Sequence, residues 1–111
     1  MRELLANEAS DPECRLAVSI YCYETRKRIG AYAAALGGLD TLVFAGGIGE
    51  HSPDIRARIC DGLEFLGARL DERKNAAHAP VISSSDDPVA VCVIPTDEEK
   101  MIAYAAYTLL R

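Results

Sequence analysis

Apolar residues recur at helical spacing over a long stretch near the start of the chain, at Val18, Cys22, Ile29, Ala33 and Leu36. Just before this stretch, "SDPEC" (10–14) is a helix-start pattern, with Ser10 as the expected N-cap and Glu13 closing a capping box. Gly37-Gly38 is a typical helix end. The pattern predicts one helix of about seven turns, with residues 26–28 ("RKR") facing solvent.

Two short apolar runs, "DTLVFA" (40–45) and "VAVCVIP" (89–95), have the length of buried strands. A helix-start pattern follows each of them. Ser52 is the expected N-cap of the first helix, with Pro53 at its first position, and Thr96 that of the second, with Glu99 at the capping-box position. The expected inner faces are Ile55, Ile59, Leu63 and Leu66, closed by Gly67, and Ile102, Ala105 and Leu109.

Between these units, residues 68–79 read as a short strand-like piece and a polar loop, and 80–88 as a short strand and a turn. Strands that alternate with helices predict an α/β fold with a mostly parallel sheet and packed helices. The length of 111 residues fits one domain, residues 1–111.

Composition narrows the class of protein. The net charge of −5 disfavours nucleic-acid binding, which normally needs a basic face, although a helix N-terminus can still bind a small anion. No apolar run approaches the length of a membrane span, and the start has no signal-peptide pattern. Cys14, Cys22, Cys60 and Cys92 lack metal-site spacing and read as reduced thiols of a cytoplasmic protein.

Candidate chemistry lies at the two strand-to-helix turns, "AGGIGEHSP" and "IPTDEE". Such turns lie at the carboxyl ends of parallel strands, where ligands bind. Gly46, Gly47 and Gly49 permit a positive φ and a close approach of a ligand to free backbone amides. A tight turn that packs helix on strand accounts for the same glycines. The stretch is neither a Walker A loop nor a G-x-G-x-x-G fingerprint.

Several charged and aromatic residues have both a structural and a functional interpretation. Glu98 and Glu99 fit a favourable interaction with the helix dipole or a carboxylate near a ligand's magnesium ion. Arg56 and Arg58 fit a solvated helix face, and His51 a helix start or a ring beside a ligand. The tyrosines fit core or interface positions: Tyr21, Tyr23, Tyr32, Tyr104 and Tyr107.

Two long motifs, "LVFAGGIGEHSPDIRARICDGLEFLG" and "VIPTDEEKMIA", resemble the carboxyl-terminal part of acetate kinases. These enzymes belong to the superfamily of actin-like ATPases and sugar kinases, which have an RNase H-like fold. The resemblance covers nearly the whole chain. It implies an ATP/ADP site, Mg²⁺ and a homodimer.

The resemblance also implies roles for particular residues. The family's G-I-G-E-N segment lines the adenine nucleotide site, and here it reads Gly47, Ile48, Gly49, Glu50 and His51. Histidine in place of the usual asparagine loses the amide's combined donor and acceptor geometry.

Three further positions match the family. Arg56 corresponds to an arginine near the nucleotide, and the first Glu of the family's T-N-E-E motif, a magnesium-site residue, corresponds to Glu98. "MRELL" resembles a D-M-R-E-L-L segment that reaches the nucleotide, with Met1 and Arg2 at its second and third positions.

The family's acetate-binding and transition-state residues lie upstream of the matching region, so no catalytic residue is assigned. We expect a fragment, a truncated reading frame or one half of a split enzyme, not active alone, whose partner is an amino-terminal kinase segment. A non-catalytic nucleotide-binding or dimerisation module, and part of a propionate or butyrate kinase, are the alternatives. An uncovered sheet edge or apolar face would favour self-association.

Overall fold

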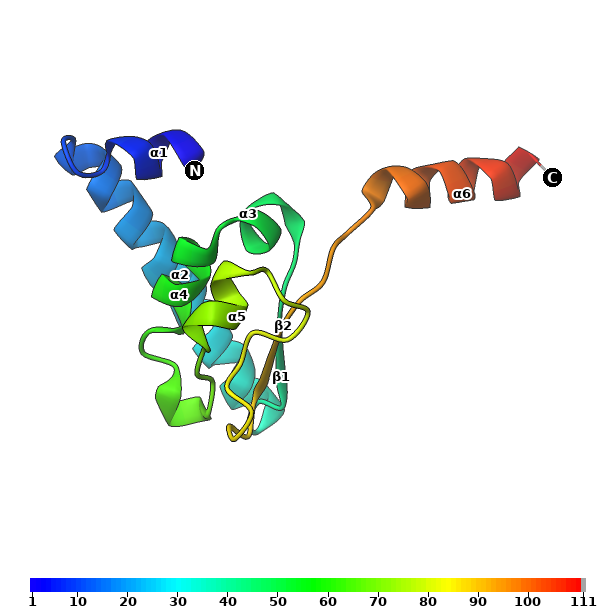
Figure 1. The fold of residues 1–111 in the computed structure, drawn as a ribbon. Coiled ribbons are helices and arrows are strands. Elements are labelled where there is room, and N and C mark those ends of the chain that lie inside the picture. Colours follow the sequence, from blue (N-terminus) through cyan, green and yellow to red (C-terminus); the bar gives the residue numbers. More distant parts are fainter. Residues whose placement is uncertain (111) are drawn as a thin grey trace.

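A computed structural model describes residues 1–110 (Figure 1). The helices are α1 (Arg2–Asn7), α2 (Pro12–Leu36), α3 (Gly46–His51), α4 (Pro53–Cys60), η1 (Glu64–Leu66), α5 (Glu72–Ala76) and α6 (Glu98–Leu110), and the strands are β1 (Thr41–Phe44) and β2 (Ala90–Val93). The two strands are parallel, with Thr41 opposite Ala90 and Phe44 opposite Val93. The long helix, both strands and the predicted α/β class are therefore confirmed.

The start of α2 differs from the prediction. Asp11 is the N-cap, and its carboxylate accepts a hydrogen bond from the Glu13 amide at 2.9 Å, whereas Ser10 lies one residue outside the helix. The prediction of Ser10 and a Ser10–Glu13 capping box was wrong, because Asp11 is also a strong cap and is directly adjacent to Pro12. The helix end is as predicted, with Gly37 in the left-handed region at φ 80°.

Helix α4 begins as predicted, with the Ser52 hydroxyl accepting from the Ile55 amide, but it ends at Cys60. A turn through Asp61 and Gly62 separates it from η1, so the expected continuous helix to Leu66 was wrong. Gly62 has φ 110°, which ends a right-handed helix. Gly67 closes η1 in the left-handed region.

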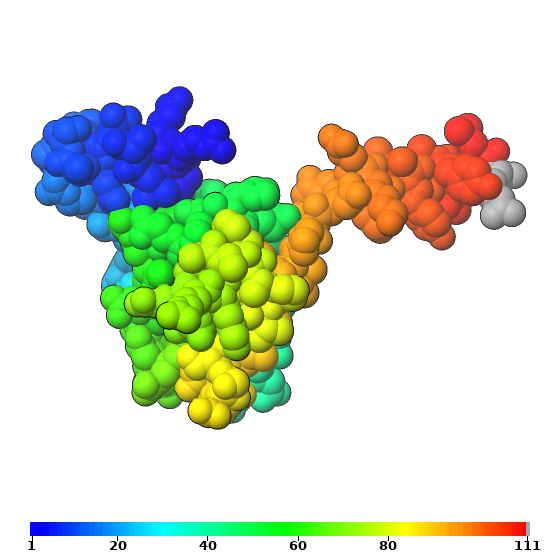
Figure 2. Space-filling view, in the orientation of Figure 1, coloured from blue at the N-terminus to red at the C-terminus, as the bar shows by residue number. Residues whose placement is uncertain are grey.

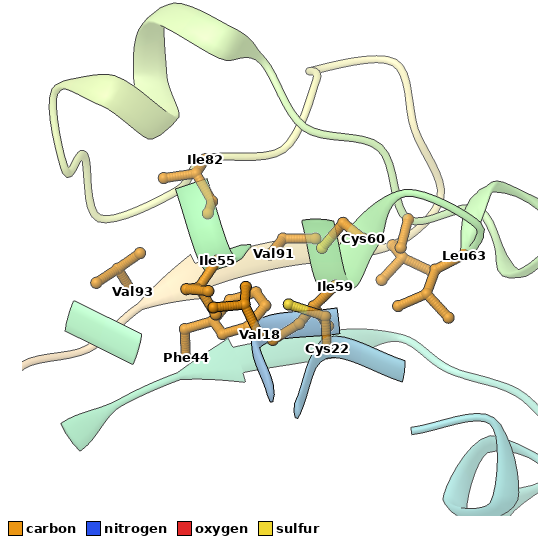
Figure 3. Packing of buried hydrophobic residues seen from close by; sticks show 12 residues of the cluster. Val18, Cys22, Phe44, Ile55, Ile59, Cys60, Leu63, Ile82, Val91 and Val93 are labelled. Atoms are coloured by element: carbon orange, nitrogen blue, oxygen red, sulfur yellow. The ribbon is translucent and has the colours of Figure 1, made fainter. Parts of the chain in front are cut away.

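The core lies where α2, the sheet and α4 meet (Figure 3). Val18 and Cys22 come from α2, and Ile55 and Ile59 from α4. Val91 of β2 is fully buried between them and the 80–88 segment, whose Ile82 amide bonds the Val91 carbonyl at 2.8 Å. The predicted short strands are only antiparallel bridges, Leu70 with Ser83 and Val81 with Cys92, and the predicted polar loop contains the short helix α5.

Helix α6 projects away from this body (Figures 1 and 2). Residues 98–110 include no buried residue, so the expected inner face at Ile102, Ala105 and Leu109 is exposed. Asp97, not Thr96, caps its first turn, because the Asp97 carboxylate accepts from the Lys100 amide at 2.9 Å. The Thr96 hydroxyl instead donates to the Glu50 carboxylate.

Other side chains are also placed differently from the sequence interpretation. Arg26 is half-buried and donates to the Arg58 and Ile59 carbonyls at the end of α4, so residues 26–28 do not all face solvent. The five tyrosines are exposed, which rules out a core role within residues 1–110. All four cysteines are free thiols, two of them buried. Within residues 1–110 no helix is long and apolar enough to cross a membrane.

Candidate functional site

The glycine-rich stretch forms the short helix α3 between β1 and α4. The sequence left two interpretations open, a turn with amides free for a ligand and a tight turn that packs helix on strand. Of Gly46, Gly47 and Gly49, only Gly46 has a positive φ (76°), and residues 46–51 are helical. Gly46 begins α3 two residues after β1 ends, in a left-handed conformation that favours glycine. A Cβ at Gly49 would lie 3.3 Å from the Phe44 carbonyl carbon, so the missing side chain lets α3 lie close to β1.

A cavity of about 440 Å³ lies between α1 and α3. Five of the residues that line it are predicted site residues, and Leu5 and Ser52 complete it: Met1, Arg2, Leu5, Gly47, Ile48, His51 and Ser52. Its lining combines apolar surface with one guanidinium. The structure therefore brings the first residues of the chain together with the glycine segment, although α2 and β1 lie between them in the sequence.

A second cavity of about 370 Å³ lies on the other side of α3. It joins α3 to the start of α6 and is rich in acidic residues: Gly46, Gly47, Glu50, His51, Thr96, Asp97, Glu98 and Glu99. The Thr96–Glu50 hydrogen bond, 3.2 Å long, ties the two elements together. Gly47 and His51 border both cavities, and Glu98 borders the acidic one.

Arg56 lies beneath α3 and lines neither of these cavities. Its side chain is completely buried, which excludes the solvated-face interpretation. Nη1 donates to the Gly49 and Glu50 carbonyls at 2.8 and 3.1 Å, at the end of α3. Arg56 thus holds the glycine segment from below.

The rest of the Arg56 guanidinium is bound by the 75–78 segment. Nε donates to Asn75 Oδ1 at 2.7 Å, Nη2 donates to the Asn75 carbonyl at 2.8 Å, and Nη2 lies 3.0 Å from His78 Nδ1. Since an arginine can only donate, His78 Nδ1 is the acceptor. None of these described partners is a carboxylate, and burial lowers the pKa of Arg56.

Arg58, in the last turn of α4, holds α1 in position. Its guanidinium bonds Glu8, which follows α1, with Nη1 to Oε2 at 2.9 Å, and it also pairs with Asp54. The hydrogen bond from Arg58 is the main reason that the pKa of Glu8 lies below its ordinary value. This pair fixes α1 relative to α4 and thereby one wall of the first cavity.

Sequence interpretation missed Leu5, Ser52, Asn75 and His78 as parts of this arrangement. Ser52 was recognised only as a cap. Asn75 was placed in a polar loop, yet it is 6% exposed and its amide donates to the Pro53 carbonyl. A single buried asparagine in a polar run leaves no mark on the hydrophobic periodicity. Its partner, Arg56, lies 19 residues away in the sequence, so no local pattern points to the pair.

The acetokinase family model matches residues 1–104. The chain belongs to this family. Among curated relatives, it is 47% identical to the acetate kinase of Coprothermobacter proteolyticus over 104 residues, which is 93% of this chain and 26% of the relative. It is 49% identical to the acetate kinase of Bacteroides fragilis over 113 aligned residues, 99% of this chain and 28% of the relative.

Solved acetokinase-family structures have the same fold. The Porphyromonas gingivalis acetate kinase matches with a TM-score of 0.85 at 40% identity, covering 99% of this chain and 29% of that one. A propionate kinase from Francisella tularensis matches with a TM-score of 0.83 at 37% identity, over 92% of this chain and 27% of that one. These matches confirm the expected resemblance and its actin-like ATPase fold. The chain spans roughly a quarter of the length of the relatives it matches.

Proposed function

We propose that residues 1–111 form the carboxyl-terminal nucleotide-binding part of an acetate kinase, which transfers a phosphoryl group between ATP and acetate. The observation that supports this best is the first cavity, where Met1 and Arg2 meet Gly47, Ile48 and His51. Residues implied by two separate motifs converge there, although nothing in the hydrophobic pattern required them to meet.

The two cavities suit different parts of an adenine nucleotide. The first offers apolar surface for the base, and Arg2 and His51 at its wall supply hydrogen-bond donors. Gly47 carries no side chain between the cavities, so a ligand can pass close to the backbone there. The second cavity then lies on the phosphate side.

We assign Mg²⁺ to the acidic cavity, with Glu98 as its residue. Within residues 1–110, no group of three or more His, Cys, Asp or Glu side chains could hold a metal ion alone. This fits Mg²⁺, which usually keeps several waters and is held by one or two carboxylates together with phosphates. When bound, the ion neutralises charge on the transferred phosphate.

Arg56 and Gly49 serve the nucleotide indirectly in this proposal. Arg56 binds the carbonyls of Gly49 and Glu50, and Gly49 seats α3 on β1. Both fix the position of α3, and with it the cavity-lining Gly47, Ile48 and His51. Arg56 is therefore a positioning residue.

Other parts of the proposal follow from family membership. The amino-terminal portion of an acetate kinase is the proposed partner, and a homodimer is supported by exposed apolar residues on α2, namely Leu16, Ile20 and Tyr23. Free cysteines support a cytoplasmic location. A propionate kinase is the second candidate, favoured by the match to the Francisella tularensis enzyme.

Calorimetric titration of the pure chain with ADP, with and without Mg²⁺, tests the nucleotide site. Gly47→Val is compared with Gly30→Val, since both glycines are helical with open space around them. Valine has no worse helix propensity than glycine, so both variants should fold. We expect saturable binding by the parent and by Gly30→Val, and none by Gly47→Val. Absence of binding by the folded parent would favour a non-catalytic module.

A further inference from the structure

The guanidinium of Arg56 has a complete set of acceptors, and one of them is an imidazole nitrogen. An arginine side chain carries five N–H donors. Two of them bond α3 at the Gly49 and Glu50 carbonyls, and two bond Asn75, at its amide oxygen and its backbone carbonyl. The fifth faces Nδ1 of His78, which lies 3.0 Å from Nη2. His78 therefore completes the bonding of a side chain that is fully buried.

The ring of His78 can accept from Arg56 in only one protonation state. Since Nδ1 is the acceptor, the proton of the neutral ring is on Nε2. A second proton can go only to Nδ1, the atom to which Arg56 donates. It would remove the acceptor and place a positive charge 3.0 Å from a guanidinium that is itself positive. A proton and the Arg56 contact therefore compete for the same nitrogen.

His78 is placed where solvent and the buried guanidinium meet. It follows α5, which lies against α4, the helix that carries Arg56 (Figure 1). The backbone of His78 is in the left-handed region at φ 52°, and its amide donates to the Asn75 carbonyl at 3.1 Å. The residue as a whole is exposed, whereas Arg56 is not. Solvent can thus deliver a proton to a ring whose inner nitrogen is bound to a buried cation.

The charges around the ring do not favour its protonation. Within residues 1–110, no carboxylate forms an ion pair with His78. The Cys60 thiol of α4 stays neutral, because burial raises its pKa to about 12. The other ionisable side chains of α3, α4, α5 and the 80–88 segment are exposed or bound elsewhere: His51, Glu72, Arg73 and Asp86 are exposed, Glu50 bonds Thr96, Asp54 pairs with Arg58, Asp71 accepts from the Lys74 amide, Lys74 donates to the Ser83 carbonyl, and Asp87 pairs with Arg69.

We propose that His78 is a proton-sensitive positioning residue for the nucleotide site. Its neutral ring completes the acceptors of Arg56, which holds α3 through two of its carbonyls. When Nδ1 takes up a proton, Arg56 loses one acceptor and holds α3 less firmly. Since α3 lines the first cavity, the chain should then bind an adenine nucleotide less tightly. This inference rests on the proposed function.

Two substitutions separate the acceptor from the proton. In His78→Asn, Oδ1 is as many bonds from the backbone as Nδ1 and can accept from Arg56, but it does not titrate, and asparagine tolerates a positive φ. His78→Gly removes the acceptor at every pH and suits the same backbone conformation. The pH dependence that comes from His51 and from ADP itself is common to all three proteins. Differences between them therefore report on position 78.

Titration with ADP and Mg²⁺ at about pH 7.5 and pH 5.5, on either side of the range where an imidazole ordinarily titrates, is the first measurement. From the higher to the lower pH, we expect the dissociation constant of the parent to rise about three- to tenfold more than that of His78→Asn, as for the loss of one hydrogen bond. His78→Gly should bind more weakly than His78→Asn by a similar factor at both pH values.

Hydrogen exchange of the Ser52 amide is the second measurement and needs no nucleotide. This amide donates to the Ile48 carbonyl of α3 at 3.0 Å. We expect its protection, corrected for the intrinsic effect of pH on exchange, to fall in acid in the parent and to persist in His78→Asn.

The outcomes separate the role of His78 from the proposed function. Loss of Ser52 protection in the acidified parent alone, without ADP binding by any of the proteins, would support the hold on α3 and contradict the proposed function. ADP binding with the same pH response in the parent and His78→Asn would overturn the inference and leave the proposed function standing. Equal pH responses of Ser52 protection in these two proteins would overturn the inference whether or not ADP binds.

Discussion

At the scale of single residues, the most informative side chain is Arg56. Its position on α4 gave two sequence interpretations, a solvated face or a nucleotide contact. It is buried and bonded to two carbonyls of α3 and to the 75–78 segment, which excludes the solvated face. Sequence alone could not predict this, because the partners belong to elements that fold over Arg56 only in three dimensions.

Replacing Arg56 by lysine should destabilise the chain. Lysine keeps the charge but has fewer donors and no planar fork, so some of the buried acceptors at Gly49, Glu50 and Asn75 lose their partner. We expect a loss of about 2–4 kcal/mol in the free energy of unfolding, measured by urea titration. Arg73→Lys, on the exposed side of α5, is the control and should change little. Equal stability of the two variants would contradict the structural role of Arg56.

The Glu8–Arg58 pair predicts a pH dependence of stability. The folded pKa of Glu8 is lowered, mainly by the hydrogen bond from Arg58, so the unfolded chain binds more protons in the acid range. The stabilisation is complete above the ordinary pKa of 4.5 and is lost as the pH falls through the lower folded value. In Glu8→Gln the urea midpoint should therefore fall less between neutral and acid pH than in the parent. The same slope in both proteins would refute this, and Glu72→Gln is the exposed control.

At the scale of elements, periodicity predicted α2, β1 and β2 well, because each buries a regular set of apolar residues. It failed where the signal is short or ambiguous. α3 and α5 have only 6 and 5 residues, too few for a helical period to appear. The α6 pattern suggested a packed inner face, yet sequence cannot say whether the surface that covers a helix lies within the same 111 residues.

The start of α2 offers a test of capping. Asp11→Ala removes the carboxylate that accepts from the Glu13 amide and should cost about 1 kcal/mol of stability. Ser10→Ala, one residue earlier, should stay within about 0.5 kcal/mol, because Ser10 is exposed and does not cap the helix. Thermal or urea unfolding followed by circular dichroism measures both. A larger loss of stability for Ser10→Ala than for Asp11→Ala would indicate that Ser10 is the N-cap, as the sequence suggested.

At the scale of the whole molecule, the sequence motifs identified the family correctly. Met1, Arg2 and the glycine segment do line one cavity, and Glu98 borders the adjoining one. Half of a cleft can bind a ligand but cannot surround the transferred phosphate.

The pure chain should therefore not form acetyl phosphate from ATP and acetate. Phosphoryl transfer depends on positioning and on charge stabilisation around the transferred group, and under our proposal the acidic cavity would contribute only a Mg²⁺ ion on one side of it. Trapping of acetyl phosphate as the hydroxamate should give the rate of the buffer alone, whereas the intact Bacteroides fragilis acetate kinase serves as positive control. Turnover that copurifies with the chain and disappears in Gly47→Val would mean that residues 1–111 hold a complete active site. Absence of such turnover would support the proposal that the catalytic groups belong to the amino-terminal portion of an acetate kinase.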